Sequence, residues 1–190
     1  MRDPSSFRDP AGYILKKDNR IIRVINNSYK SDYKIFKESG LYDKLADTKK
    51  IVCLKEINDN IKNVVCYKLL EVEKIDIITY PYEWSFSQFK DAALLTLEIQ
   101  LLSIEHGMKL KDATPYNIQF KNNKPIFIDT LSFECVSENY AWEAYRQFCE
   151  MFLGPIYLMS RVDPRISKQL ITSINGIPLD LINKYLSFKD

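Results

Sequence analysis

The sequence predicts an α+β protein with a small antiparallel sheet plus one helix over residues 1–79 and a mainly helical part over residues 80–190. Two observations lead to this prediction. Short runs of β-branched and aromatic residues, separated by polar turns, are concentrated before residue 80. The longest apolar run with helical spacing comes after it. Because 46% of the 190 residues are hydrophobic, we expect the two parts to pack as one compact unit.

The first part contains the predicted sheet. A β-hairpin is expected over residues 12–25, with a polar turn at residues 16–19. Ser31 and Asp32 can cap a helix that extends to Leu45 and can break at Gly40. Three further short apolar runs are expected to be strands, at residues 51–54, 64–70 and 75–79.

The second part is expected to begin with a long helix. Ser85 or Ser87 can cap it, and Gly107 can end it after His106. This helix is apolar nearly all round, so we expect it to be buried on all sides. Further helices are expected at residues 141–152, where Gly154-Pro155 should interrupt the pattern, and at residues 156–160, 164–173 and 179–186.

Composition and charge favour a soluble, cytoplasmic protein. The 27 basic and 25 acidic residues give a net charge of +2, which indicates neither a nucleic-acid partner nor a membrane surface. The four cysteines are widely spaced and form no C-x-x-C pair, so neither a zinc site nor a disulfide framework is indicated. No run of about 18 apolar residues that would span a membrane is present.

The segment Leu110 to Glu134 carries the clearest chemical signal. Asp112 and Asn117 are five residues apart in D-x-x-P-x-N, and Pro115 between them excludes a regular helix. Two short apolar runs around Lys121-Asn122-Asn123-Lys124 follow and predict a hairpin, after which comes Asp129. A hairpin returns the chain to its start, so Asn117 and Asp129 should lie side by side. Their oxygens could bind Mg²⁺, while Asp112 could accept a proton from a hydroxyl.

This arrangement resembles the catalytic loop and metal-binding Asp of protein kinases and of aminoglycoside and choline kinase-like phosphotransferases. The resemblance covers roughly residues 80–134 and implies a two-lobed kinase-like fold. It also implies that Asp112 is the general base and that Asn117 and Asp129 are the metal ligands, with ATP and Mg²⁺ as cofactors. Leu110-Lys111 and Thr130-Leu131 depart from the His-Arg and Phe-Gly of protein kinases. The alternative is that these polar residues only shape ordinary turns.

The residues that would hold a nucleotide are less well marked. The first hairpin turn has no glycine cluster, and backbone amides approach phosphate less closely without glycine. Arg23 or Lys68 could take the place of the strand lysine that holds phosphates, although Arg23 could instead be a solvated strand charge. Tyr82 could stack on an adenine ring or pack between the two parts. Lys111 could neutralise a transferring phosphoryl group or be a surface residue.

A second resemblance spans nearly the whole chain. Segments such as YPYEWSFSQFKDAALLTLEIQ, HGMKLKDATPYNIQF, PIFIDTLSFE and AYRQFCEMFLGPIYLMS are similar to the N-terminal region of a bacterial family of class I S-adenosylmethionine-dependent methyltransferases related to nodulation proteins. In that family a methyltransferase domain is expected to follow this region. The five glycines of this chain never come close enough together to form the cofactor loop of such a domain.

Two hypotheses for function follow. The first is a Mg²⁺- and nucleotide-dependent phosphotransferase that acts on a small hydroxylated substrate. The second is a non-catalytic kinase-like module that associates with a methyltransferase domain or protein. A third hypothesis, methyl transfer by this chain itself, would require S-adenosylmethionine binding without a recognisable loop.

Overall fold

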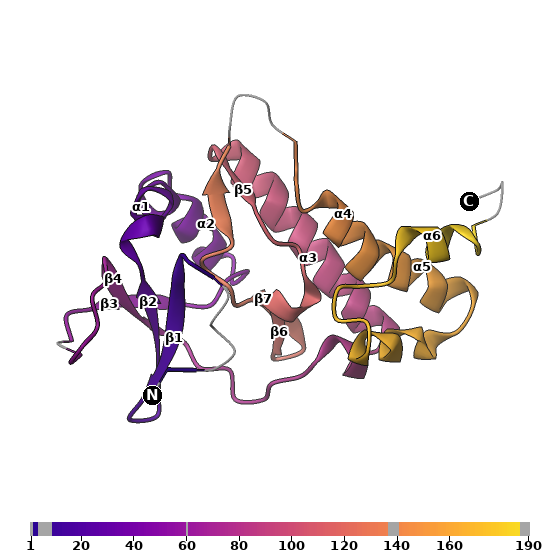
Figure 1. Cartoon of the computed structure of the whole chain (residues 1–190), viewed down its shortest axis with the longest axis horizontal. Helices are drawn as coiled ribbons and strands as arrows, with labels where there is room; N and C mark the ends of the chain where they lie inside the picture. The colour runs from indigo at the N-terminus through magenta and orange to yellow at the C-terminus, as the bar shows by residue number, and fades with distance from the viewer. Residues whose placement is uncertain (1, 4–8, 60, 137–140, 187–190) are drawn as a thin grey trace.

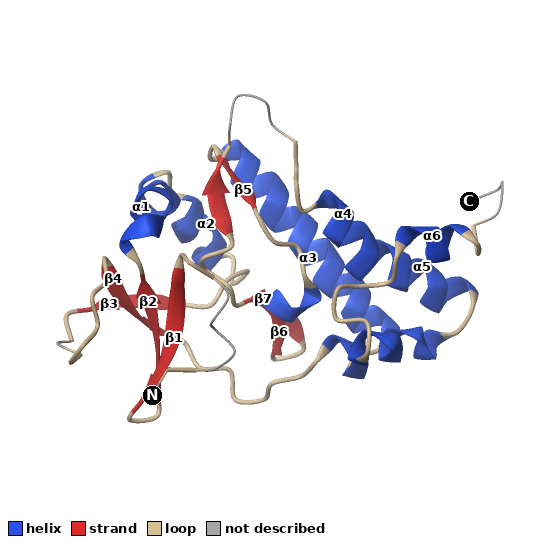
Figure 2. Cartoon of the chain, in the orientation of Figure 1, coloured by secondary structure: helices blue, strands red, loops and turns tan. Residues whose placement is uncertain are grey.

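The structure, a computed structural model, describes residues 2–3, 9–59, 61–136 and 141–186. Over these residues the protein is mixed α+β, with a small antiparallel sheet and six α-helices, as the sequence predicts. Figure 1 shows the sheet and helices α1 and α2 on one side of the long helix α3, and helices α4 to α6 on the other. Figure 2 shows that the remaining short strands lie between these two groups.

The first half of the chain forms the four-stranded sheet and two short helices. Its elements, in order, are β1 Gly12–Lys17, β2 Arg20–Ile25, the 3₁₀ turn η2 Asn27–Tyr29, α1 Lys30–Glu38, α2 Leu41–Asp47, β3 Leu54–Ile57 and β4 Lys68–Val72. Gly40 between the two helices has a φ of 81°, a left-handed conformation that glycine adopts without steric cost. This confirms the predicted break at Gly40.

The sheet has the strand order β1-β2-β4-β3, and all its neighbours are antiparallel. Arg23 in β2 lies opposite Leu70 in β4, and Ile25 lies opposite Lys68. Because alternate residues of a strand share a face, these four side chains lie on the same face of the sheet. Leu70 and Ile25 on that face belong to the main core of the protein. Arg23 therefore projects from the sheet toward the second half of the chain.

The second half is built around α3. Its elements are the 3₁₀ turn η3 Pro81–Glu83, α3 Phe86–Glu105, β5 Met108–Leu110, the 3₁₀ turn η4 Pro115–Asn117, β6 Ile118–Lys121, β7 Lys124–Phe127, β8 Phe133–Cys135, α4 Tyr145–Phe148, the π-helix η5 Cys149–Leu153, α5 Gly154–Arg161, the 3₁₀ helix η6 Pro164–Ile171 and α6 Leu179–Asn183. Ser85 caps α3 by accepting a hydrogen bond from the backbone N–H of Gln88. Strands β6 and β7 pair as a hairpin, and β5 pairs with β8.

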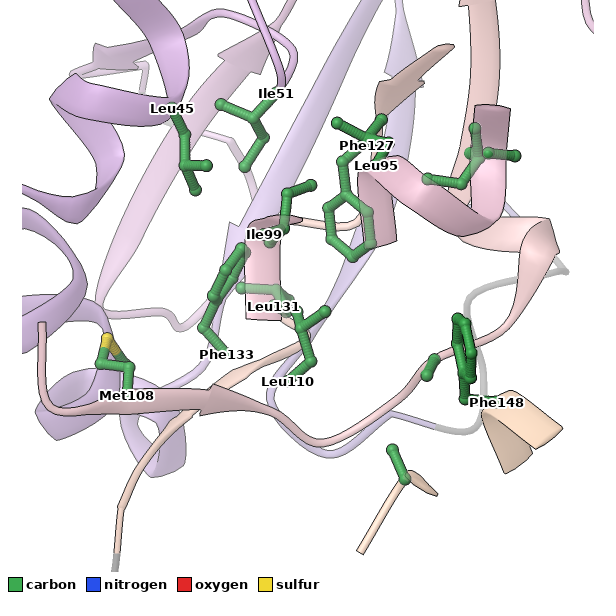
Figure 3. Packing of buried hydrophobic residues seen from close by; sticks show 14 of the residues in the cluster. Leu45, Ile51, Leu95, Ile99, Met108, Leu110, Phe127, Leu131, Phe133 and Phe148 are labelled. Atoms are coloured by element: carbon green, nitrogen blue, oxygen red, sulfur yellow. The ribbon is translucent and has the colours of Figure 1, made fainter. Parts of the chain in front are cut away.

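One continuous core joins the two halves. It contains Tyr29, Phe36 and Leu70 from the first half, and Phe89 and Phe152 from the second. Figure 3 shows a part of this cluster, in which side chains from α3 lie beside those of the hairpin and of the segment before β8. A separate small cluster, which includes Ile22 and Val24, covers the other face of the sheet.

Two of the predicted strands differ in position from the structure, and a third is absent. Residues 51–54 and 64–70 contribute strands shifted toward the C-terminus, at Leu54–Ile57 and Lys68–Val72. Residues 75–79 form no strand, although their apolar pattern predicts one. Here the side chain of Gln119 takes the place of a neighbouring strand. It accepts from the backbone N–H of Thr79 at 2.9 Å and donates to its carbonyl at 3.0 Å.

The prediction that Gly154-Pro155 interrupts a helix is wrong. The chain continues from α4 through the π-helix η5 into α5 without a break. In η5 the N–H of Gly154 donates to the carbonyl of Cys149, five residues earlier. Pro155 has no N–H, so it cannot continue this pattern to Glu150. The carbonyl of Glu150 instead accepts from the N–H of Ile177 at 2.8 Å, which joins a distant loop to the helix.

The prediction that α3 is buried on all sides is also wrong. Its Phe89, Leu95 and Ile99 are buried, but Leu101 is 63% exposed and Leu94 is 48% exposed. Hydrophobic residues all round a helix show that each face is apolar, but they do not show how many faces the fold covers. Within the described part of the chain, no helix is long and apolar enough to cross a membrane.

Candidate functional site

Hydrogen bonds link three of the predicted site residues, with the hydroxyl of Ser132 between two of them. The amide Nδ2 of Asn117 donates to Ser132 Oγ at 3.2 Å and to Asp112 Oδ2 at 3.4 Å. Ser132 Oγ donates to Asp129 Oδ2 at 2.7 Å. Asp112, Asn117 and Asp129 therefore form one polar cluster, as the hairpin between them predicts.

Local backbone structure explains this convergence. The hydroxyl of Thr114 accepts from the backbone N–H of Tyr116 and caps the 3₁₀ turn η4, which ends at Asn117. The hairpin turns at Asn122 and Asn123, both with positive φ, as a two-residue turn of this kind requires.

The end of the hairpin then returns to its start. The N–H of Ile128 donates to the carbonyl of Asn117 at 2.9 Å. On either side of Ser132, the fully buried Leu131 and Phe133 extend into the core, as Figure 3 shows. These contacts hold the backbone of the cluster in place.

Arg23 joins the cluster from the sheet. Its Nη1 lies 2.8 Å from Asp129 Oδ1, and its Nη2 lies 3.4 Å from the carbonyl of Ile128. The side chains of Arg23 and Asp129 are 13% and 24% exposed, so the ion pair is mostly buried. The buried Nε of Arg23 has no hydrogen-bond partner among the described residues. Arg23 therefore has one buried donor that no described residue satisfies.

The pKa values of the two carboxylates in the cluster are shifted in opposite directions. Burial raises the pKa of Asp112, and the nearby charge of Asp129 adds to this effect. Burial alone would also raise the pKa of Asp129. The guanidinium of Arg23, the hydroxyl of Ser132 and the N–H of Leu131 outweigh it and hold that pKa below its ordinary value. Carboxylates whose environments separate their pKa values in this way can divide acid and base roles between them.

Gln147, on α4, orients Asp112. It hydrogen-bonds the Asp112 side chain, which counteracts part of the rise in pKa, and its Oε1 accepts from the N–H of Ala113 at 2.7 Å. Lys111, next to Asp112 in sequence, lies 3.4 Å from Asp9 and 5.5 Å from the ring centre of Tyr29. Its charge lowers the pKa of both carboxylates.

The structure does not bring Lys68 or Tyr82 into the cluster. Lys68 forms an ion pair with Glu56 at 2.7 Å. Tyr82 stacks on Tyr80 with ring centres 5.4 Å apart. In the described part of the chain, no hydrogen bond, ion pair or ring contact connects either residue to Asp129. Of the two phosphate-binding candidates, Arg23 alone reaches the cluster.

Sequence analysis missed Ser132 and Gln147. Ser132 follows Asp129 by three residues, and a hydroxyl at that spacing is common in turns. Gln147 lies 35 positions beyond Asp112 in a segment whose strongest pattern is aromatic. Neither residue type nor spacing could have indicated these contacts, because both depend on the packing of α4 and β8 around the loop.

Carboxyl and amide side chains like those of the cluster are of the kinds that can bind Mg²⁺ through oxygen. Among the described residues, no group of three or more His, Cys, Asp or Glu side chains is arranged to hold a metal ion. Mg²⁺ commonly binds through one or two carboxylates together with substrate phosphates and waters. The carboxylate of Asp129 fits this smaller ligand set, whereas Asn117 turns its amide nitrogen toward Ser132 and Asp112 and would have to present its Oδ1 to bind a metal ion. Arg23 would share Asp129 with the ion.

A pocket of about 480 Å³ lies beside the cluster. Lys111, Thr114 and Gln147 line it, which places it next to the Asp112 loop. Its other wall is formed by Glu150 and Met151 of η5 and by the loop after η6. The pocket therefore opens on the Asp112 side of the cluster, whereas Arg23 and the sheet lie on the Asp129 side.

Fold and site together define a mixed α+β protein with a buried polar cluster of two carboxylates, an amide and a guanidinium. No family model matches the chain. The chain is similar to the nodulation protein NoeA of Rhizobium meliloti (strain 1021), with 32% identity over 189 residues that cover 98% of this chain and 39% of the relative. This agrees with the resemblance to nodulation-related proteins. The chain spans well under half the length of this relative.

Proposed function

We propose that this chain is a Mg²⁺- and nucleotide-dependent phosphotransferase with a kinase-like fold, acting on a small hydroxylated substrate. The observation that carries the proposal is the chain of hydrogen bonds that links Asp112 to Asn117, Asn117 to Ser132 and Ser132 to Asp129. The order of the elements also supports it: a sheet with helices, a connecting segment, the long helix α3, the Asp112 loop, a hairpin and then Asp129.

Asp112 is suited to the role of base. Burial raises its pKa toward the range in which a carboxylate takes a proton more readily, and it lies beside an open pocket. The acceptor hydroxyl gives its proton to Asp112 as its oxygen bonds to the terminal phosphorus of the nucleotide. The bond from that phosphorus to the bridging oxygen breaks, and the nucleoside diphosphate leaves.

Asp129, Asn117 and Arg23 are suited to holding the phosphates. Mg²⁺ on the Asp129 and Asn117 oxygens would neutralise phosphate charge during the transfer. Arg23 would add a guanidinium, whose fork of donors matches phosphate oxygens. The first hairpin has no glycine-rich loop, and Arg23 would supply part of the phosphate contact that such a loop makes.

A thermal-shift titration tests the proposal. Mg-ATP or Mg-GTP should raise the Tm of the wild type, because a ligand that binds the native state stabilises it by mass action. Asp129→Asn should abolish the shift, whereas Asp112→Asn should retain it and lose phosphoryl transfer by about 10²-fold or more. Asp163→Asn, in a surface ion pair with Arg165, is the matched control. No shift in the wild type with either nucleotide would refute the proposal.

One observation favours a second function, that of a non-catalytic kinase-like module associated with a methyltransferase domain or protein. Asp129 is already neutralised by Arg23 and hydrogen-bonded to Ser132, so its charge is compensated within the chain. A structural role of this kind predicts that Asp129→Asn lowers stability but leaves the activity of an assembly with the methyltransferase unchanged. It also predicts that neither Mg-nucleotide nor S-adenosylmethionine shifts the Tm of this chain.

A further inference from the structure

We propose that the pocket beside Asp112 binds a neutral saccharide, whose hydroxyl faces the cluster. The assignment rests on the proposed function only for the reaction of that hydroxyl. The binding itself follows from the shape and chemistry of the pocket.

The pocket is placed to present a ligand to Asp112. Lys111 and Thr114, on either side of Asp112 in sequence, both line it. Gln147 lines it as well and also hydrogen-bonds Asp112. Asp112 itself is not part of the lining, and the pocket meets its carboxylate through Gln147, the side chain that orients it.

The far wall of the pocket is preformed. The carbonyl of Glu150, which Pro155 cannot bond, anchors the loop after η6 through the N–H of Ile177. Gly176 of that loop has a φ of 97°, and a Cβ there would lie 2.6 Å from the Glu150 carbonyl oxygen. Only glycine allows such a close approach. The π-helix and this loop thus hold Glu150 and Ile174 on one side of the pocket, and π-helical turns often occur at functional sites.

The charges of the pocket are balanced, which favours a neutral ligand. Lys111 is paired with Asp9 at 3.4 Å. Glu150 accepts from Arg146 Nε at 3.0 Å, and Glu143 is paired with Lys109. An ionic ligand would therefore have to compete with an existing ion pair at each charged position.

The remaining lining suits a molecule that carries many hydroxyl groups. Thr114 and Asn175 offer a hydroxyl and a carboxamide, which can both donate and accept hydrogen bonds. Met151 and Ile174 add apolar surface, against which the C–H face of a sugar ring can pack. The volume of about 480 Å³ lies within the range of small-molecule pockets, about 300–1,000 Å³.

Saturation-transfer-difference NMR, without nucleotide or Mg²⁺, tests this assignment. The probes are glucose, maltose and cellobiose, with glucosamine and glucuronate as charged counterparts. We expect saturation transfer to at least one neutral saccharide and weaker transfer to the charged sugars. The double variant Ile174→Ala/Asn175→Ala should reduce the signal at least several-fold. Ile171→Ala is the matched control, because Ile171 is exposed to a similar degree, 57% against 55%, and lies outside the pocket.

Each outcome decides the assignment. No transfer to any neutral saccharide, equal signals from the double variant and the control, or stronger binding of a charged sugar would overturn it. If saccharide binds while no nucleotide shifts the Tm, the proposed phosphoryl transfer fails and the saccharide site remains.

Discussion

The two carboxylates of the polar cluster, Asp129 and Asp112, differ in their partners and in the direction of their pKa shifts. On one side, Asp129 is neutralised by Arg23 and hydrogen-bonded by Ser132, and its pKa is lowered. On the other side, Asp112 has amide partners, Gln147 and Asn117, and no ion pair with any residue that the structure describes, and burial raises its pKa. The comparison shows how one cluster can combine a carboxylate held in its ionised form by its neighbours with a carboxylate suited to exchanging protons.

The largest expected effect comes from breaking the ion pair on the Asp129 side. Arg23→Ala should lower the free energy of unfolding by about 3 kcal/mol, because it leaves a mostly buried carboxylate uncompensated. Urea denaturation measures this change. The control is Arg165→Ala, because the side chain of Arg165 is 82% exposed and pairs with Asp163 at the surface. This variant should lower the free energy of unfolding by less than about 1 kcal/mol. Equal losses in both variants would mean that the Arg23 pair is no stronger than a surface pair.

Removing the hydroxyl of Ser132, which links Asn117 to Asp129, should have the next largest effect on stability. Ser132→Ala removes the hydroxyl that receives the Asn117 amide and donates to Asp129. Leaving these buried groups short of a partner should cost about 1–3 kcal/mol of stability in the same assay. Ser160→Ala is the control, since its exposed hydroxyl donates only to the nearby carbonyl of Tyr157. If the two serine variants unfold alike, Ser132 does not hold the cluster together.

The pH dependence of stability should have opposite signs on the two sides. Because the pKa of Asp129 is lowered in the folded state, its stabilising contribution is present above its unfolded pKa of about 3.9 and is lost as pH falls through the folded value. Because the pKa of Asp112 is raised, its ionisation lowers stability as pH rises from about 3.9 through the folded value.

Asparagine variants measured by urea denaturation over a range of pH test this difference. Asp129→Asn should be less stable than the wild type at neutral pH, by an amount that shrinks in acid. Asp112→Asn should be as stable as the wild type or more stable at neutral pH, with the gain vanishing in acid. Parallel profiles for the two variants would contradict the division of roles.

The smallest expected effect concerns Gln147. Its hydrogen bond to Asp112 favours the ionised carboxylate, so Gln147→Ala should raise the pKa of Asp112 further. NMR titration of the side-chain carboxyl carbons would measure the shift, with the resonance of Asp112 assigned through Asp112→Asn. Asp129 should titrate as in the wild type, because Gln147 is not among the groups that shift its pKa. A change in the pKa of Asp129 with none in that of Asp112 would mean that Gln147 acts on Asp129 rather than on Asp112.

Local sequence patterns were sufficient for much of the fold. The two hairpins, the Ser85 cap of α3 and the stop at Gly107 all depend on residues within a few positions of one another, so short-range patterns predict them. Where a partner distant in sequence takes part, prediction failed. Residues 75–79 read as a strand, but the side chain of Gln119 replaces the strand neighbour.

In the candidate site too, local contacts were predictable from the sequence and contacts between distant residues were not. The sequence by itself determined that Asp112, Asn117 and Asp129 would meet, because a hairpin returns the chain to its starting point. Only the tertiary structure decided that Arg23, 106 residues from Asp129, would pair with it, and that Ser132 and Gln147 would join the two carboxylates to their surroundings. The physical reason is that carboxylates of the same residue type differ in pKa through burial and neighbouring charge, and packing between distant elements sets both.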